Sequence, residues 1–288
     1  MSAATGAARA LLLSACAAAA PVLAIDFSSM LSTAGRVAGA IKPAQTDQEA
    51  AAQEKLIGEQ AAQEILSKAP LAPLPSLQRY VNQVGRYVAD RSERHDVEWR
   101  FGVIDDAAAN AWAAPDGYVF ITTGMLADVG SEAELAGVLA HEIEHVVQRH
   151  HLKAIEAANR RSELSELAAI AQDTAGVSTP SVNAQLEALR GSIGQLYERG
   201  LDRGDELDAD RRGVALAGKA GYDPYGLPLV LQALGAHGKD DATLTVFTRT
   251  HPSIEDRLRK LEPVLESLDP AYFPGRTLEE RYRKYVQF

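Results

Sequence analysis

The stretch Ala140–His145 (AHEIEH) contains the pattern His-Glu-x-x-His, and the rest of the chain is organised around it. A helix is expected here, because Ser131 followed by Glu134 is typical of a capping box at a helix start. Apolar residues then recur at helical spacing, at Leu135 and within 138–147. The pattern is therefore expected on a helix that begins near residue 131.

The two histidines of this pattern are four residues apart, so they lie on one face of the helix. His141 and His145 can both point at one ion, and neutral imidazoles suit zinc. Glu142 lies about 100° round the helix, where it can border the ion and act as a general base. Chance gives roughly 0.01 such patterns in a chain of this histidine content. The competing interpretation is a solvated helix that carries two histidines by coincidence.

The composition indicates a globular chain without a general nucleic-acid function. Hydrophobic residues make up 46% and charged residues 24% of the 288 residues, which permits a sizeable core in one or two domains. The net charge of −10 provides no basic excess to neutralise phosphate. Outside the N-terminus, no apolar run approaches the ~20 residues of a transmembrane helix.

Residues 1–24 are typical of a signal peptide, because Arg9 is the only charge and small apolar residues follow it. Cleavage after Ala24 is favoured. The alternative is a lipoprotein signal in which Cys16, the only cysteine, becomes a lipidated N-terminus. Both signals predict export. The expected location is the periplasm, with an outer-membrane lipoprotein as the alternative, and membrane contact is expected only if Cys16 is lipidated.

Helix-forming residues and helix breakers divide the rest of the chain. A loose linker is expected over 25–46, followed by a helix over 47–68 that the prolines of 69–75 interrupt. His150 and His151 extend the metal helix and are expected to face solvent. Further helices are predicted at about 76–92, 153–172, 182–200, from 205 onward, 225–236 and 253–268. Residues of about 172–200 are a candidate for a mobile lid, because Gly and Ser interrupt them.

Two segments have the composition of β-strands. Residues 98–104 (EWRFGVI) alternate, and residues 117–124 (GYVFITTG) are β-branched and aromatic, while residues 105–116 are typical of a loop. The second strand directly precedes the metal helix. As an edge strand it could hold an extended peptide by backbone pairing along Tyr118, Val119, Phe120 and Ile121. The simpler interpretation is an ordinary core strand.

A catalytic zinc takes three protein ligands and keeps one position open. The best third ligand lies in residues 206–211 (ELDADR), where Glu206 and Asp210 share one helical face. Glu206 can bind the ion while Asp210 accepts the outer N–H of a liganding imidazole, which fixes the orientation of the ring. Without the metal helix, this run would be interpreted as the acidic start of a solvated helix.

Four segments, in order, resemble the CAAX-prenyl-protease-like zinc metallopeptidases, in particular their soluble bacterial periplasmic branch. Their order makes the signal specific, and together they cover most of the chain after the export signal. The segments are residues 110–126 (NAWAAPDGYVFITTGML), 137–146 (GVLAHEIEHV), Arg203 with 206–211, and 250–252 (THP) with Arg257.

The resemblance implies a mainly helical α+β fold, with a zincin-like metallopeptidase domain over 75–268 and a small β-sheet beside the metal helix. A linker and N-terminal helix (25–74) would precede this domain, and a C-terminal tail (269–288) would follow it. The resemblance also implies that His141, His145 and Glu206 bind one zinc ion per chain. Glu142 would be the general base for the hydrolysis of internal peptide bonds.

The same resemblance places His251 near the metal. There it could stabilise the oxyanion or act as a transient fourth ligand. The alternative is a histidine that caps the helix begun by Pro252. Arg203 is a second, weaker candidate for stabilising the oxyanion from outside the ligand set.

These features predict a zinc-dependent endopeptidase that acts on misfolded or stalled envelope proteins in periplasmic quality control. The outer-membrane assembly machinery is a further candidate partner. The rival hypothesis is a zinc-stabilised, chaperone-like binding protein with little proteolytic activity, which a fourth ligand at His251 would favour. A different metal hydrolase, such as an amidase, fits less well, because it would need no peptide-binding strand.

Overall fold

A computed structural model of the chain describes residues 46–158, 160–161, 182–237 and 241–287. The predicted export signal with Cys16, the linker up to residue 45 and most of the predicted helix 153–172 lie outside these residues. The predicted lid is described only from residue 182. Within the described residues, no helix combines the length and the apolar character needed to cross a bilayer.

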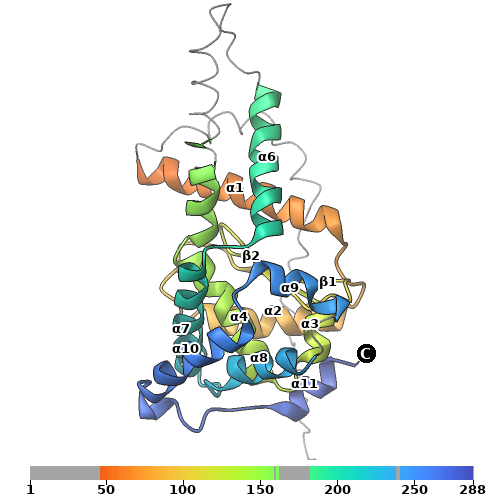
Figure 1. The fold of residues 1–288 in the computed structure, drawn as a ribbon, viewed down its shortest axis with the longest axis vertical. Coiled ribbons are helices and arrows are strands. Elements are labelled where there is room, and N and C mark those ends of the chain that lie inside the picture. Colours follow the sequence, from red (N-terminus) through yellow and green to blue (C-terminus); the bar gives the residue numbers. More distant parts are fainter. Residues whose placement is uncertain (1–45, 159, 162–181, 238–240, 288) are drawn as a thin grey trace, which may run out of the picture.

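The described residues form mainly helices and one small sheet, which confirms the predicted α+β class. Figure 1 shows α1 and α6 at one end of the molecule, while the other labelled helices gather around α4. The elements are α1 (Asp47–Lys68), α2 (Pro75–Ala89), β1 (Arg100–Ile104), β2 (Ala111–Ala114), β3 (Tyr118–Thr122), α3 (Thr123–Asp128), α4 (Glu132–Val147), α6 (Val182–Arg199), α7 (Arg203–Lys219), α8 (Gly226–Ala236), α9 (Thr245–Thr250), α10 (Ile254–Glu266) and α11 (Glu279–Tyr285), with short 3-10 turns at Ala242–Leu244 and Pro270–Tyr272.

The sheet has the strand order β1-β3-β2, so β3 is its central strand. β1 pairs with β3 in parallel, and β2 pairs with β3 antiparallel. The prediction of an edge strand at Tyr118, Val119, Phe120 and Ile121 is therefore wrong, because backbone pairing already occupies both edges of β3. The edge strands are β1 and β2, and β2 forms inside the segment predicted to be a loop.

Alternate side chains of β3 enter two different hydrophobic clusters. Tyr118 and Phe120 pack with residues of α1 and α6. Val119 and Ile121 pack with residues of α2, α4 and α8. β3 is consequently buried on both faces. It is the ordinary core strand of the simpler prediction and not a peptide-binding strand.

Helix α4 is buried along almost its whole length. It begins as predicted: Ser131 Oγ accepts from the backbone N–H of Glu134 at 3.2 Å. The Glu134 carboxylate reaches one residue further back than a capping box requires and accepts from the N–H of Gly130 at 2.8 Å. This cap fixes the start of the helix that carries the two histidines.

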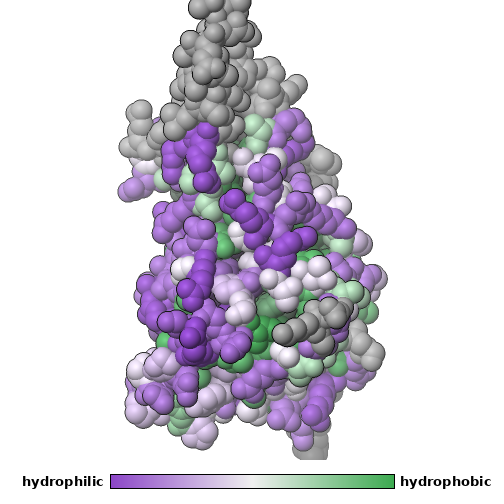
Figure 2. Space-filling view, viewed as in Figure 1, coloured by the Kyte–Doolittle hydropathy of each residue, from purple (hydrophilic) through white to green (hydrophobic). Residues whose placement is uncertain are grey.

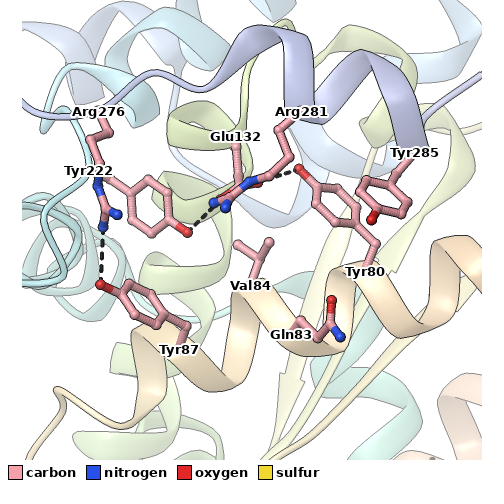
Figure 3. Close-up of a pocket in the computed structure, with 9 residues that line it drawn as sticks. All are labelled: Tyr80, Gln83, Val84, Tyr87, Glu132, Tyr222, Arg276, Arg281 and Tyr285. Atoms are coloured by element: carbon pink, nitrogen blue, oxygen red, sulfur yellow. Dashed lines mark hydrogen bonds and ion pairs between the residues drawn. The ribbon is translucent and has the colours of Figure 1, made fainter. Parts of the chain in front are cut away.

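The first turn of α4 also holds a fully buried carboxylate, Glu132. The hydroxyl groups of Tyr80 and Tyr222 donate to it at 2.9 and 2.7 Å, and Arg281 of α11 forms an ion pair with it. Figure 3 shows these four side chains along the floor of a cavity of about 330 Å³ between α2 and the C-terminal segment. Tyr282, which follows Arg281, is buried in the same hydrophobic cluster as α4. Residues near the C-terminus therefore pack against the metal helix.

Candidate metal centre

The two histidines of α4 face each other inside the protein. Their Nε2 atoms are 3.1 Å apart, and both rings are almost completely buried. The four-residue spacing produces this arrangement, because one helical turn brings side chains at i and i+4 together. His141 and His145 thus present two imidazole nitrogens to a single point.

Helix α7 supplies the carboxylate that faces these nitrogens. Glu206 Oε2 is 3.6 Å from His141 Nε2, and Glu206 Oε1 is 3.6 Å from His145 Nε2. The two helices approach closely at Gly213, where a Cβ atom would lie only 3.0 Å from the backbone of His141. The absence of a side chain at Gly213 therefore lets α7 bring Glu206 to the histidines.

These three residues fit a metal ion. Their ligand atoms lie within 4.8 Å of one another. Glu206 Oε2 is buried and accepts no hydrogen bond from any described residue, and a buried carboxylate oxygen without a partner is costly. A cation bound by the three side chains would satisfy it. Two imidazoles and one carboxylate are a ligand set of catalytic zinc, which leaves a fourth position for water or substrate.

Burial and neighbouring charges shift the pKa values of these groups. Burial acts to lower the pKa of His141, but the adjacent carboxylates of Asp210 and Glu206 outweigh it and raise the pKa to about 9. Burial, reinforced by the nearby His141, lowers the pKa of His145. Burial acts to raise the pKa of Glu206, but His251 and His141 hold it at about 2. The Glu206 carboxylate is therefore ionised at physiological pH.

Asp210 supports His141 from outside the ligand set, one helical turn after Glu206. Its Oδ1 lies 3.0 Å from His141 Nδ1. Arg257 of α10 donates to both oxygens of Asp210, at 2.8 and 2.6 Å, and is itself buried. The ion pair with Arg257 keeps Asp210 ionised and orients its carboxylate toward His141. His141 then carries its proton on Nδ1 and leaves Nε2 for a metal.

Glu142 lies beside the ligands, as its position on the helix predicts. It is 3% exposed, and its carboxylate groups with ligand-type atoms of His141 and His251. Burial, together with the negative charge of Glu206, raises the pKa of Glu142 to about 7. A carboxylate with a pKa near 7 can both accept and return a proton, which suits a general base.

His251 lies at the end of α9 with its ring stacked on Phe247, and the two ring centroids are 4.5 Å apart. His251 Nδ1 lies 3.2 Å from the carbonyl oxygen of Phe247, and only a protonated nitrogen can donate to a carbonyl. Nε2 is then bare, 3.6 Å from Glu206 Oε2. Ser253, whose Oγ accepts from the Asp256 N–H, caps the next helix. The predicted alternative, a capping role for His251, is therefore wrong.

Arg203 does not lie where the sequence predicts. Its guanidinium is 60% exposed and donates to Asp256 at 2.6 and 2.9 Å. None of its hydrogen bonds or ion pairs with the described residues reaches the ligand set. The buried arginine beside the site is Arg257, which the sequence marks only as part of a motif.

His150 and His151 do not face solvent, contrary to the prediction. His150 is 5% exposed, and its Nδ1 lies 3.0 Å from His145 Nδ1. His151 stacks on Tyr197 of α6 at 5.2 Å. The cause is local: α4 ends at Val147, Arg149 adopts a left-handed conformation (φ 57°), and a new helix starts at residue 150 with a different set of faces. A pattern that assumes one continuous helix cannot detect this turn.

Two small cavities, each of about 20 Å³, flank Glu142, and Ala111 of β2 lines both. One is lined mainly by apolar side chains of α8 and α9. Figure 2 shows an apolar area around α8 on an otherwise mainly hydrophilic face. On β2 the carbonyl of Ala113 accepts from the hydroxyl of Tyr197 at 2.7 Å. Because Ala111 and Glu142 line the same two cavities, β2 runs past the candidate catalytic Glu142.

The sequence matches one known protein family and is similar to several characterised proteases. The model of peptidase family M48 matches residues 75–264. The beta-barrel assembly-enhancing protease of Escherichia coli (strain K12) is 28% identical over 208 residues, which cover 72% of this chain and 42% of that protein. The mitochondrial metalloendopeptidase OMA1 of Schizosaccharomyces pombe is 32% identical over 212 residues, which cover 73% of this chain and 60% of that protein. The chain therefore spans less than two thirds of these relatives.

Proposed function

Since the chain belongs to peptidase family M48, we propose that it is a zinc-dependent endopeptidase. The observation that carries this proposal is that ligand atoms of His141, His145 and Glu206 lie together, with Glu142 beside them. One oxygen of Glu206 is buried there without a hydrogen-bond partner among the described residues. The carboxylate of Glu142 is buried beside this ligand set, and burial raises its pKa to about 7, as suits a group that accepts and returns a proton.

The side chains have distinct roles in the proposed reaction. When bound, zinc polarises a carbonyl group and lowers the pKa of a water molecule. Glu142 takes a proton from the attacking water onto its carboxylate and later gives it to the nitrogen of the leaving amine. Asp210 and Arg257 hold the ring of His141 in place during these steps. Burial of the site excludes bulk water and strengthens each of these electrostatic interactions.

A substrate would lie along β2, which replaces β3 as the candidate binding strand. β2 has one edge free of strand pairing and lines both cavities beside Glu142. An extended peptide can add to such an edge through backbone hydrogen bonds, once the Tyr197 hydroxyl has left the carbonyl of Ala113. The cavity lined by α8 and α9 has room for about one water molecule, so an apolar substrate side chain would enter there only if these helices move apart.

His251 is proposed as a fourth metal ligand at rest rather than an oxyanion donor. Its Nδ1 proton is engaged by the Phe247 carbonyl, so Nε2 has a lone pair but no hydrogen to donate. A ligand that has to leave before substrate binds would hold the peptidase at low activity.

The proposed substrates are misfolded or stalled envelope proteins, and the proposed location is the periplasm, or the outer membrane if Cys16 is lipidated. The composition of residues 1–24 supports export. The name of the E. coli relative supports a link to outer-membrane assembly. The match covers only 42% of that relative. The specific substrates and partners are therefore proposals for this chain.

Zinc content and casein cleavage should be measured on the same preparations of the wild type and Glu142→Gln. Equal zinc near one ion per chain, with cleavage by the wild type alone, is the expected result. Equal zinc without cleavage in either protein would favour the rival binding protein, and His251→Ala would then test whether the fourth ligand blocks the site. Absence of zinc from both would refute the proposal.

A further inference from the structure

The turn that follows α4 places another histidine, His150, against the ligand His145. α4 ends at Val147, Arg149 takes a positive φ of 57°, and a new helix starts at residue 150. The ring of His150 therefore lies against the ring of His145, with centroids 5.2 Å apart and an interplanar angle of 73°. This contact lies on the side of His145 that faces away from the other ligands.

The contact joins two specific nitrogens and continues to a carboxylate. His145 Nδ1 and His150 Nδ1 are 3.0 Å apart. His150 Nε2 lies 3.6 Å from Asp205 Oδ1, which is too long for a hydrogen bond but close enough for the carboxylate charge to attract a proton on that nitrogen. We propose that His150 is a positioning residue that holds His145 in its metal-binding tautomer, through a relay that ends at Asp205. The proposal rests on the metal site described above.

The position of each proton follows from the geometry. To bind a metal at Nε2, His145 must carry its proton on Nδ1, and that N–H donates to His150 Nδ1. His150 must then carry its own proton on Nε2, which faces the carboxylate of Asp205. The reverse arrangement would point an N–H of His145 at the other ligands and remove the N–H that faces Asp205. The relay therefore selects the tautomer that leaves Nε2 of His145 free.

The two ligand histidines are supported in different ways. His141 meets the carboxylate of Asp210 directly, whereas His145 meets a neutral imidazole that lies between it and Asp205. Asp205 lies in the first turn of α7, next to the ligand Glu206. The relay thus ties the end of α4 to the helix that supplies the third ligand.

The test compares variants that keep or remove the acceptor. His150→Phe keeps a ring but removes Nδ1, and His150→Asn places an amide oxygen where Nδ1 was. His151→Phe is the matched control, because His151 Nδ1 is buried without a hydrogen-bond partner among the described residues. Zinc affinity of the metal-free chains is measured by competition with a chromophoric chelator. His150→Phe should bind zinc about 10–100-fold more weakly, while His150→Asn and His151→Phe should stay within about threefold of the wild type.

A second readout does not depend on zinc or on the fold of a variant. The long-range ¹H–¹⁵N imidazole spectrum of the metal-free wild type should show His145 protonated at Nδ1. His150→Phe with wild-type affinity would overturn the proposal, and so would a spectrum with the His145 proton on Nε2. If the wild type binds no zinc, the proposed peptidase function fails, whereas the spectrum still decides the tautomer.

Discussion

Replacing Arg257 by Met should destabilise the fold strongly, because it removes the guanidinium that pairs with both oxygens of the buried Asp210 and leaves only His141 beside that carboxylate. Both side chains are 2% exposed, and two hydrogen bonds of 2.8 and 2.6 Å join them. Water cannot reach Asp210 to replace the lost guanidinium, and removal of one member of a buried pair costs about 3–5 kcal/mol. Methionine fills much of the aliphatic volume, so the loss measures mainly charge rather than packing.

The free energy of unfolding should be measured by urea denaturation in the presence of a chelator, so that metal binding does not add to the stability. Arg203→Met is the matched control, since Arg203 also pairs with a single carboxylate but is 60% exposed. An exposed pair of this kind contributes about 0–1 kcal/mol. Asp210→Asn and the double variant complete a cycle in which the pair should show a coupling of about 2 kcal/mol.

An Arg257→Met variant no less stable than Arg203→Met would refute this reasoning. It would mean that Asp210 is already neutralised by another group or that water enters the site. Additive effects of Arg257→Met and Asp210→Asn would lead to the same conclusion, because a direct pair cannot be lost twice.

Three further results are expected. Burial raises the pKa of Asp116 from 3.8 to about 6 in the folded chain. The folded chain therefore loses stability as pH rises from about 4 through 6, because the buried carboxyl group has to ionise. Asp116→Asn should raise the free energy of unfolding by about 1–3 kcal/mol at pH 8. An equal effect at pH 3.5, seen in the same urea titrations, would contradict that cause. His251→Ala should bind zinc more weakly yet cleave casein at least as fast as the wild type, and slower cleavage would assign the oxyanion to His251 instead. Saturating zinc at 100 times its dissociation constant should raise the stability of the metal-free chain by about 2.7 kcal/mol, and a melting temperature insensitive to zinc would argue against binding at the native site.

Local signals predicted the parts of the structure that depend on neighbours in sequence. The helix over 47–68 forms with the predicted bounds, since helix formers fill it and prolines follow. The capped start of α4 and the i, i+4 pair of Glu206 and Asp210 also arise within one element. The structure brings both Glu206 and Asp210 to His141, as the helical spacing requires.

The errors concern relations between elements. β2 has four residues, too few for a visible alternation, and alanine is a poor strand former. Whether β3 is central depends on the order of strands, which no single segment encodes. Arg203 and Arg257 both lie in family-like segments, but only the crossing of α10 with α7 decides which arginine meets Asp210.

The ion pair between Glu132 and Arg281 also sets an order of events during synthesis. Glu132 opens the helix that carries His141, whereas its guanidinium partner follows 149 residues later in the chain. Until residue 281 has emerged, the first turn of α4 has a buried acid without its countercharge. A growing chain therefore possesses its histidines long before their helix is fully held, because the ion pair at the first turn of that helix forms only after residue 281 has been added.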